Sequence, residues 1–143
     1  MTTEPYDEQR IGASDSIIRR INRDQHVIWD DNRSCYRIAS KAYKPSSGPH
    51  GGMSVDIESL MIADGQDPRV YVTTPVFLGS VSFYAADIRG LQLRVGYDPI
   101  PGNPYHGEVW GGFERPNRFT SAQSRGLAAA ARWYVEIPGV ELA

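Results

Sequence analysis

The sequence predicts a single α+β domain, built on a mixed or mainly antiparallel sheet of about four to six short strands with about two to three helices. Three observations predict it. The chain has 143 residues, the size of one domain. Alternating apolar patterns and helix-like apolar stripes both occur, without the regular strand–helix alternation of a doubly wound sheet. Finally, 14 glycines and 10 prolines indicate many turns and long loops rather than a helical bundle.

The first part of the chain predicts a helix. Residues 1–13 are polar and aperiodic, so we expect a flexible lead-in, followed by one domain over 14–143. The helix would start at Ser14 or Asp15, since both residue types cap helices well. Its apolar stripe would hold three isoleucines: Ile17, Ile18 and Ile21. Three nearby arginines then indicate a solvated helix face or, alternatively, a partner-binding patch: Arg19, Arg20 and Arg23.

The middle of the chain contains two predicted strands, a loop and a helix. Residues 35–39 favour a strand, and 45–52 hold three glycines and two prolines, which favour a loop. Ser54 would cap a helix that ends near Gly65. The β-branched run 70–74 predicts a further strand.

The last part of the chain alternates more clearly. Three strands are predicted, at 80–84, 92–97 and 105–110. Two helical turns would lie over 85–91. A capping-box pattern at Thr120 and Gln123 starts the last helix, which fades into a short strand at 135–137.

Composition excludes several classes of protein. A net charge of -2 gives no basic surplus, which argues against nucleic acid as a partner. The single cysteine, Cys35, cannot form an intramolecular disulfide, and no signal-peptide pattern precedes the domain. No apolar run approaches the ~18 residues of a membrane span. These features favour a cytoplasmic protein without membrane contact.

The best candidate site is the predicted strand at 105–110. Side chains alternate along a strand, so His106, Glu108 and Trp110 would project from one face. His106 and Glu108 would then lie within about 7 Å and could share a ligand or exchange protons with it. Gly107, on the opposite face, would leave room for a close-packed neighbour. The alternative is a surface His–Glu pair that contributes well under ~1 kcal/mol.

A second candidate segment is the glycine-rich turn before Ser54. Free N–H groups at a helix N-terminus bind anions, so His50, Gly51, Gly52 and Ser54 are candidate ligand-binding residues. Phosphate, NAD or another nucleotide would suit such a site. The alternative is a flexible loop that ends in an ordinary helix cap. No metal is expected, because the histidines and carboxylates lack metal-ligand spacing.

Arg37, Ser54 and the triplet that ends in Glu108 follow one another along the chain as an arginine, a serine and a carboxylate. This order resembles the R-S-E layout of arginine-type ADP-ribosyltransferases. The resemblance implies NAD chemistry, with Arg37 and Ser54 holding NAD and Glu108 stabilising a positively charged sugar. The chain departs from that layout because the triplet has His106 where the family has Glu or Gln, and because Arg37 and Ser54 are close in sequence.

These observations support two functional hypotheses. The first is a small enzyme or nucleotide-ligand domain with His106, Glu108 and Arg37 as catalytic residues. The second is a protein-interaction module, such as an antitoxin, an immunity protein or an accessory subunit of a bacterial operon. In that case Tyr105, His106 and Trp110 would anchor the interface, because aromatic residues dominate binding hot spots. In the first case Tyr105 and Trp110 would stack on the ligand.

Overall fold

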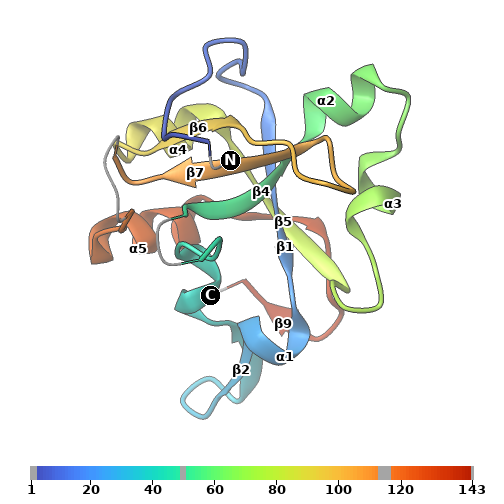
Figure 1. Cartoon of the computed structure of the whole chain (residues 1–143). Helices are drawn as coiled ribbons and strands as arrows, with labels where there is room; N and C mark the ends of the chain where they lie inside the picture. Colours follow the sequence, from blue (N-terminus) through green and yellow to red (C-terminus); the bar gives the residue numbers. More distant parts are fainter. Residues whose placement is uncertain (1–2, 49–50, 113–116, 143) are drawn as a thin grey trace.

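The α+β prediction is confirmed by the computed structural model, which describes residues 3–48, 51–112 and 117–142. Within these residues the strands form a six-stranded antiparallel sheet and a three-stranded sheet (Figure 1). The strands of the large sheet are, side by side, β6 (Arg94–Tyr97), β7 (His106–Trp110), β4 (Met53–Ile57), β1 (Ser16–Ile21), β5 (Gly79–Tyr84) and β8 (Arg132–Val135). The small sheet contains β2 (Val27–Asp30), β3 (Cys35–Ile38) and β9 (Val140–Glu141).

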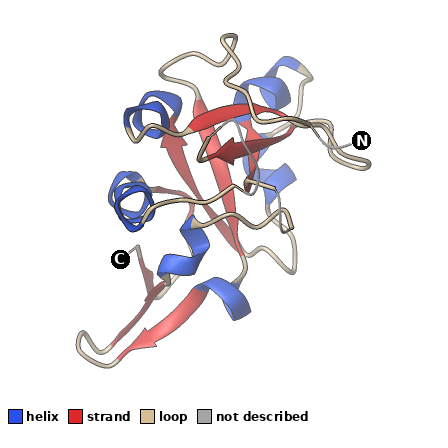
Figure 2. Cartoon of the chain, turned by 60° about the vertical axis from the view of Figure 1, so that its left-hand side comes forward, coloured by secondary structure: helices blue, strands red, loops and turns tan. Residues whose placement is uncertain are grey.

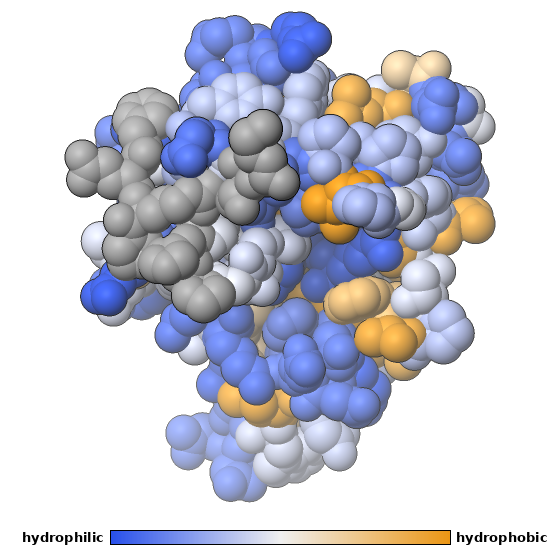
Figure 3. Space-filling view, in the orientation of Figure 1, coloured by the Kyte–Doolittle hydropathy of each residue, from blue (hydrophilic) through white to orange (hydrophobic). Residues whose placement is uncertain are grey.

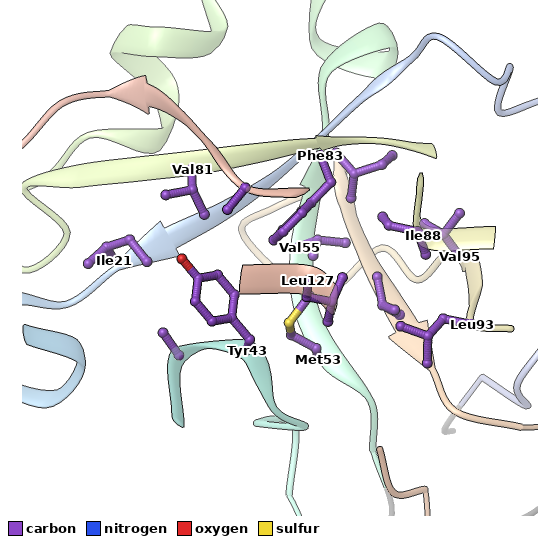
Figure 4. Close-up of a cluster of buried hydrophobic side chains, with 14 of the residues drawn as sticks. Ile21, Tyr43, Met53, Val55, Val81, Phe83, Ile88, Leu93, Val95 and Leu127 are labelled. Carbon is purple, nitrogen blue, oxygen red and sulfur yellow. The ribbon is translucent and has the colours of Figure 1, made fainter. Parts of the chain in front are cut away.

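Helices cover both faces of the large sheet, as Figure 2 shows. The described α-helices are α1 (Arg23–His26), α2 (Glu58–Ala63), α3 (Pro68–Val72), α4 (Ala85–Gly90) and α5 (Ser121–Ala130), with a 3-10 turn η1 (Ser40–Tyr43). On one face α4, α5 and η1 enclose the larger hydrophobic cluster, in which Tyr43 contacts Phe83 edge-on (Figure 4). On the other face α2 and α3 pack over a smaller cluster that includes Ile18, Met61 and Tyr134.

β1 replaces the helix predicted up to Ile21, and that prediction is wrong. Ile17 and Ile21 face the larger cluster, whereas Ile18 faces the smaller one. A central strand buried on both faces loses the alternating pattern, and its apolar run can then imitate a helical stripe. For the same reason, the prediction that Arg19 and Arg20 lie on a solvated helix face is wrong: both are on β1, and Arg19 is only 5% exposed.

Two further predictions fail for related reasons. Ser54 lies on the central strand β4 rather than capping a helix, and α2 begins only at Glu58. The β-branched run 70–74 falls largely in α3 instead of a strand. There the Asp67 side chain accepts a hydrogen bond from the Arg69 N–H, and Pro68 occupies the first turn, so local capping outweighs β-propensity.

The remaining predicted elements agree with the structure within a few residues at their ends, except at the C-terminus. There α5 ends at Ala130, and β8 (Arg132–Val135) shares only residue 135 with the strand predicted at 135–137. The capping box at Thr120 and Gln123 is present and starts α5. Residues 3–13, expected to be a flexible lead-in, pack on the sheet: Ile11 is 1% exposed, and the Tyr6 hydroxyl accepts a hydrogen bond from the Tyr97 N–H. Among the described residues, no helix is long and apolar enough to cross a membrane.

Candidate functional site

The register of β4 and β7 places the predicted site residues together. Ser54 is the register partner of Glu108, and Asp56 is the partner of His106. Register partners in adjacent strands lie on the same face of a sheet. Both predicted segments therefore meet on one face, which sequence reasoning alone left open.

A pocket of ≈240 Å³ opens on this face beside β1, β4 and β7. Its polar lining includes Arg20, Ser54, Asp56, Asn103 and His106. Phe77 and Ile100 supply apolar walls. Figure 3 shows hydrophilic residues between hydrophobic ones, to the right of the centre of the molecular surface in that view.

Asp56 holds the side chains of Arg20 and Asn103 in the pocket. Its carboxylate accepts a hydrogen bond from Arg20 Nε at 2.8 Å and from Asn103 Nδ2 at 2.7 Å. Only 4% of the Asp56 side chain is exposed, and a buried carboxylate needs such partners. The Arg20 guanidinium also lies over the rings of Tyr71 and Phe77. These contacts orient the Arg20 side chain in the pocket.

His106 presents a defined tautomer. Its Nδ1 lies 2.7 Å from the carbonyl oxygen of Asp98. A carbonyl oxygen only accepts hydrogen bonds, so Nδ1 must carry the proton. In the neutral ring Nε2 then has a free lone pair and is the nitrogen left for a ligand. The Asp98 carboxylate lies 3.8 Å from the same Nδ1.

Glu108 lies next to the pocket and does not line it. The residue is 2% exposed, and burial raises the pKa of its carboxyl group. The nearby Ser47 hydroxyl and Gly52 N–H act on the carboxyl group in the opposite direction and lower its pKa. Its Oε2 has no hydrogen-bond partner in the part of the chain that the structure describes.

The glycine-rich loop reaches this carboxylate because glycine permits a close approach. A Cβ atom on Gly52 would collide with the carbonyl of Val109 on β7. Gly51 is equally confined, against the backbone of Ser47. Neither glycine lies at a helix N-terminus, so the helix cap on which the anion site was predicted is absent at this position. His50 falls outside the described residues.

The other predicted site residues lie elsewhere. Arg37 is on β3 of the small sheet, where its Nε donates to Asp30 at 2.9 Å, and the structure does not bring it to the pocket. Trp110 is fully buried, and Tyr105 is 6% exposed with its hydroxyl bonded to Asp64. Neither aromatic residue is free to anchor an interface.

Among the pocket residues, sequence reasoning missed Arg20; Asn103 and Asp56 stand in the two candidate segments but were not singled out as ligand-binding residues. A usable signal existed. Asp56 stands between Val55 and Ile57, and a charge inside an apolar strand requires a buried partner. Arg20 is the matching charge in the isoleucine-rich segment, but the pair becomes visible only when both segments are interpreted as strands.

Among the residues described, no group of three or more His, Cys, Asp or Glu side chains could hold a metal ion. No protein-family model matches the chain, and neither a curated protein nor a solved structure matches it significantly.

Proposed function

We propose that the pocket binds a small phosphorylated ligand, such as a sugar phosphate or a mononucleotide, and that His106 accepts a proton or hydrogen bond from it. The observation that carries this proposal is the Arg20 guanidinium, which Asp56 holds in a pocket that His106 also lines. The pocket therefore combines an arginine that can bind a phosphate group with a histidine that can act as a general base.

The charges favour an anion. Arg20 donates to Asp56 through Nε and Nη2, and within the described residues no hydrogen bond occupies its Nη1, which can therefore meet a ligand. The planar guanidinium suits phosphate geometry better than a lysine ammonium. Arg19 also borders the pocket, but its side chain lies on the opposite face of the sheet, where Nε donates to the Ala42 carbonyl at 2.9 Å and Nη1 to the Ser54 carbonyl at 3.0 Å.

The size of the pocket limits the ligand. Pockets for drug-sized ligands have volumes of roughly 300–1,000 Å³. A volume of ≈240 Å³ suits a sugar phosphate or the phosphate and ribose of a mononucleotide. We therefore propose a smaller ligand than a complete NAD molecule.

The test compares two matched lysine variants. Arg20→Lys keeps a positive charge beside Asp56 but removes the planar fork, so we expect the affinity for inorganic phosphate to fall about tenfold or more. Arg37→Lys makes the same change at an arginine that also donates to a carboxylate, on the small sheet. It should leave binding unchanged in isothermal titration calorimetry. Equal loss in both variants, or loss in Arg37→Lys alone, would contradict the proposal.

A further inference from the structure

We infer that the phosphorylated ligand is a mononucleotide, and that its base packs against Phe77 and Ile100 at the mouth of the pocket. The inference rests on the proposed function, because it names the ligand class of the same pocket. Two apolar walls carry it, each held by a tight turn, and both line the pocket together with Arg20.

Ile100 is the first residue of a tight turn. Its N–H donates to the Asn103 carbonyl at 3.2 Å, and its carbonyl accepts a hydrogen bond from the Asn103 N–H at 3.0 Å. Pro101 and Gly102 occupy the two central positions, and Gly102 has a φ of 83°, which glycine adopts without strain. The backbone of the turn therefore holds Ile100 in place before any ligand binds.

Phe77 closes a second turn, in the segment between α3 and β5. The Thr74 N–H donates to the Phe77 carbonyl at 3.0 Å, and the Phe77 N–H donates to the Thr74 hydroxyl at the same distance. Pro75 follows Thr74 and restricts the backbone further. Both apolar walls are thus preorganised, so a ligand that packs against them orders little of the protein on binding.

The fold leaves much of this apolar surface uncovered. Ile100 is 44% exposed, and the two sequence neighbours of Phe77, Val76 and Leu78, are exposed as well. Exposed apolar side chains that gather at the edge of a pocket mark a binding site. A ligand with an apolar part would therefore cover surface that otherwise meets water.

The neighbourhood of charge and apolar surface fits a nucleotide better than a sugar phosphate. The Arg20 guanidinium lies over the Phe77 ring, 5.9 Å from the ring centroid, so the group proposed to bind phosphate adjoins an apolar wall. The volume of ≈240 Å³ suits the phosphate and the ribose, which would leave the base at the opening. There the flat faces of a base can pack on apolar side chains while its polar edges stay in water. A sugar phosphate would leave both walls exposed to water.

Calorimetry with inorganic phosphate, ribose 5-phosphate and adenosine 5′-monophosphate (AMP) tests the inference. The last two compounds differ by the base, and we expect AMP to bind about fivefold or more tightly than ribose 5-phosphate. Ile100→Ala and Phe77→Ala should each lower this gain several-fold, because each removes one wall. Ile100→Ala should also leave the affinity for ribose 5-phosphate unchanged. Since Ile100 is exposed and backbone hydrogen bonds close its turn, this variant separates binding from folding.

The control is Ile62→Ala, the same change at an exposed isoleucine on α2 that does not line the pocket. It should alter none of the three affinities. If AMP binds no tighter than ribose 5-phosphate, the inference fails while the proposed anion pocket stands. If the gain persists in both Ile100→Ala and Phe77→Ala, the base binds elsewhere and the inference is refuted. If the wild type binds none of the three compounds, the proposed function itself is wrong.

Discussion

His106 contacts the protein through one ring nitrogen and leaves the other for the pocket. Nδ1 donates to the Asp98 carbonyl, and the residue is 8% exposed. Asparagine and glutamine each reproduce one of these nitrogens, because the amide of Asn reaches the Nδ1 position and that of Gln reaches the Nε2 position. Substitution at this residue can therefore separate folding from binding.

We expect His106→Asn to keep the bond to Asp98 and to lose ligand recognition. Its free energy of unfolding should stay within about 1 kcal/mol of the wild type, whereas ribose 5-phosphate should bind several-fold more weakly. His106→Gln should show the reverse, since it leaves the part-buried Asp98 carbonyl unpaired at a cost of about 1–2 kcal/mol. Urea denaturation and calorimetry measure the two effects. Wild-type affinity in His106→Asn would exclude a role for Nε2.

At the scale of elements, the sequence predicts strands with a clear local alternation better than the central strands β1 and β4. The strand with His106 and Glu108 is recognisable, because its alternation and its proline-rich lead-in are local features. The central strands β1 and β4 are not, because both of their faces are buried by helices distant in sequence. The site prediction therefore found the β7 half of the pocket and missed Arg20 on β1.

Gly107 shows how tightly β7 fits between its neighbours. A Cβ atom there would lie 2.6 Å from the Gly96 carbonyl oxygen and 2.8 Å from Ile57 Cδ1. The predicted close-packed neighbour is therefore confirmed. We expect Gly107→Ala to lower the free energy of unfolding by about 1–3 kcal/mol, because the added methyl group overpacks the sheet.

Gly90 provides the matched control for this substitution. It lies in α4 with a φ outside the left-handed region, and a Cβ atom there would meet nothing within 4 Å. Gly90→Ala should raise stability by about 0.5–1 kcal/mol, since alanine loses less backbone entropy on folding. Urea midpoints of both variants give the comparison. A Gly107→Ala variant as stable as the wild type would show that the sheet spacing there is relaxed.

At the scale of the whole molecule, the two sheets join at α1, and His26 lies in that junction. Its Nδ1 accepts a hydrogen bond from the Asn22 N–H at 2.9 Å, and its carbonyl accepts one from Ala39 in the chain that leaves β3. The pKa of His26 is lowered from 6.5 to about 4, mainly by burial and further by the positive charges of Arg19 and Lys41. The folded protein therefore requires a neutral imidazole at this position.

Acid should consequently weaken the whole fold through His26. A group with a lowered pKa in the folded state contributes its full stability above its unfolded pKa of 6.5 and loses it as the pH falls through about 4. We expect about 2–3 kcal/mol to be lost over that interval. His26→Asn keeps an acceptor for the Asn22 N–H but cannot be protonated there, so its unfolding free energy should fall less steeply. Urea unfolding of both proteins between pH 7 and pH 4 measures the difference, and parallel curves would show that His26 does not control the junction.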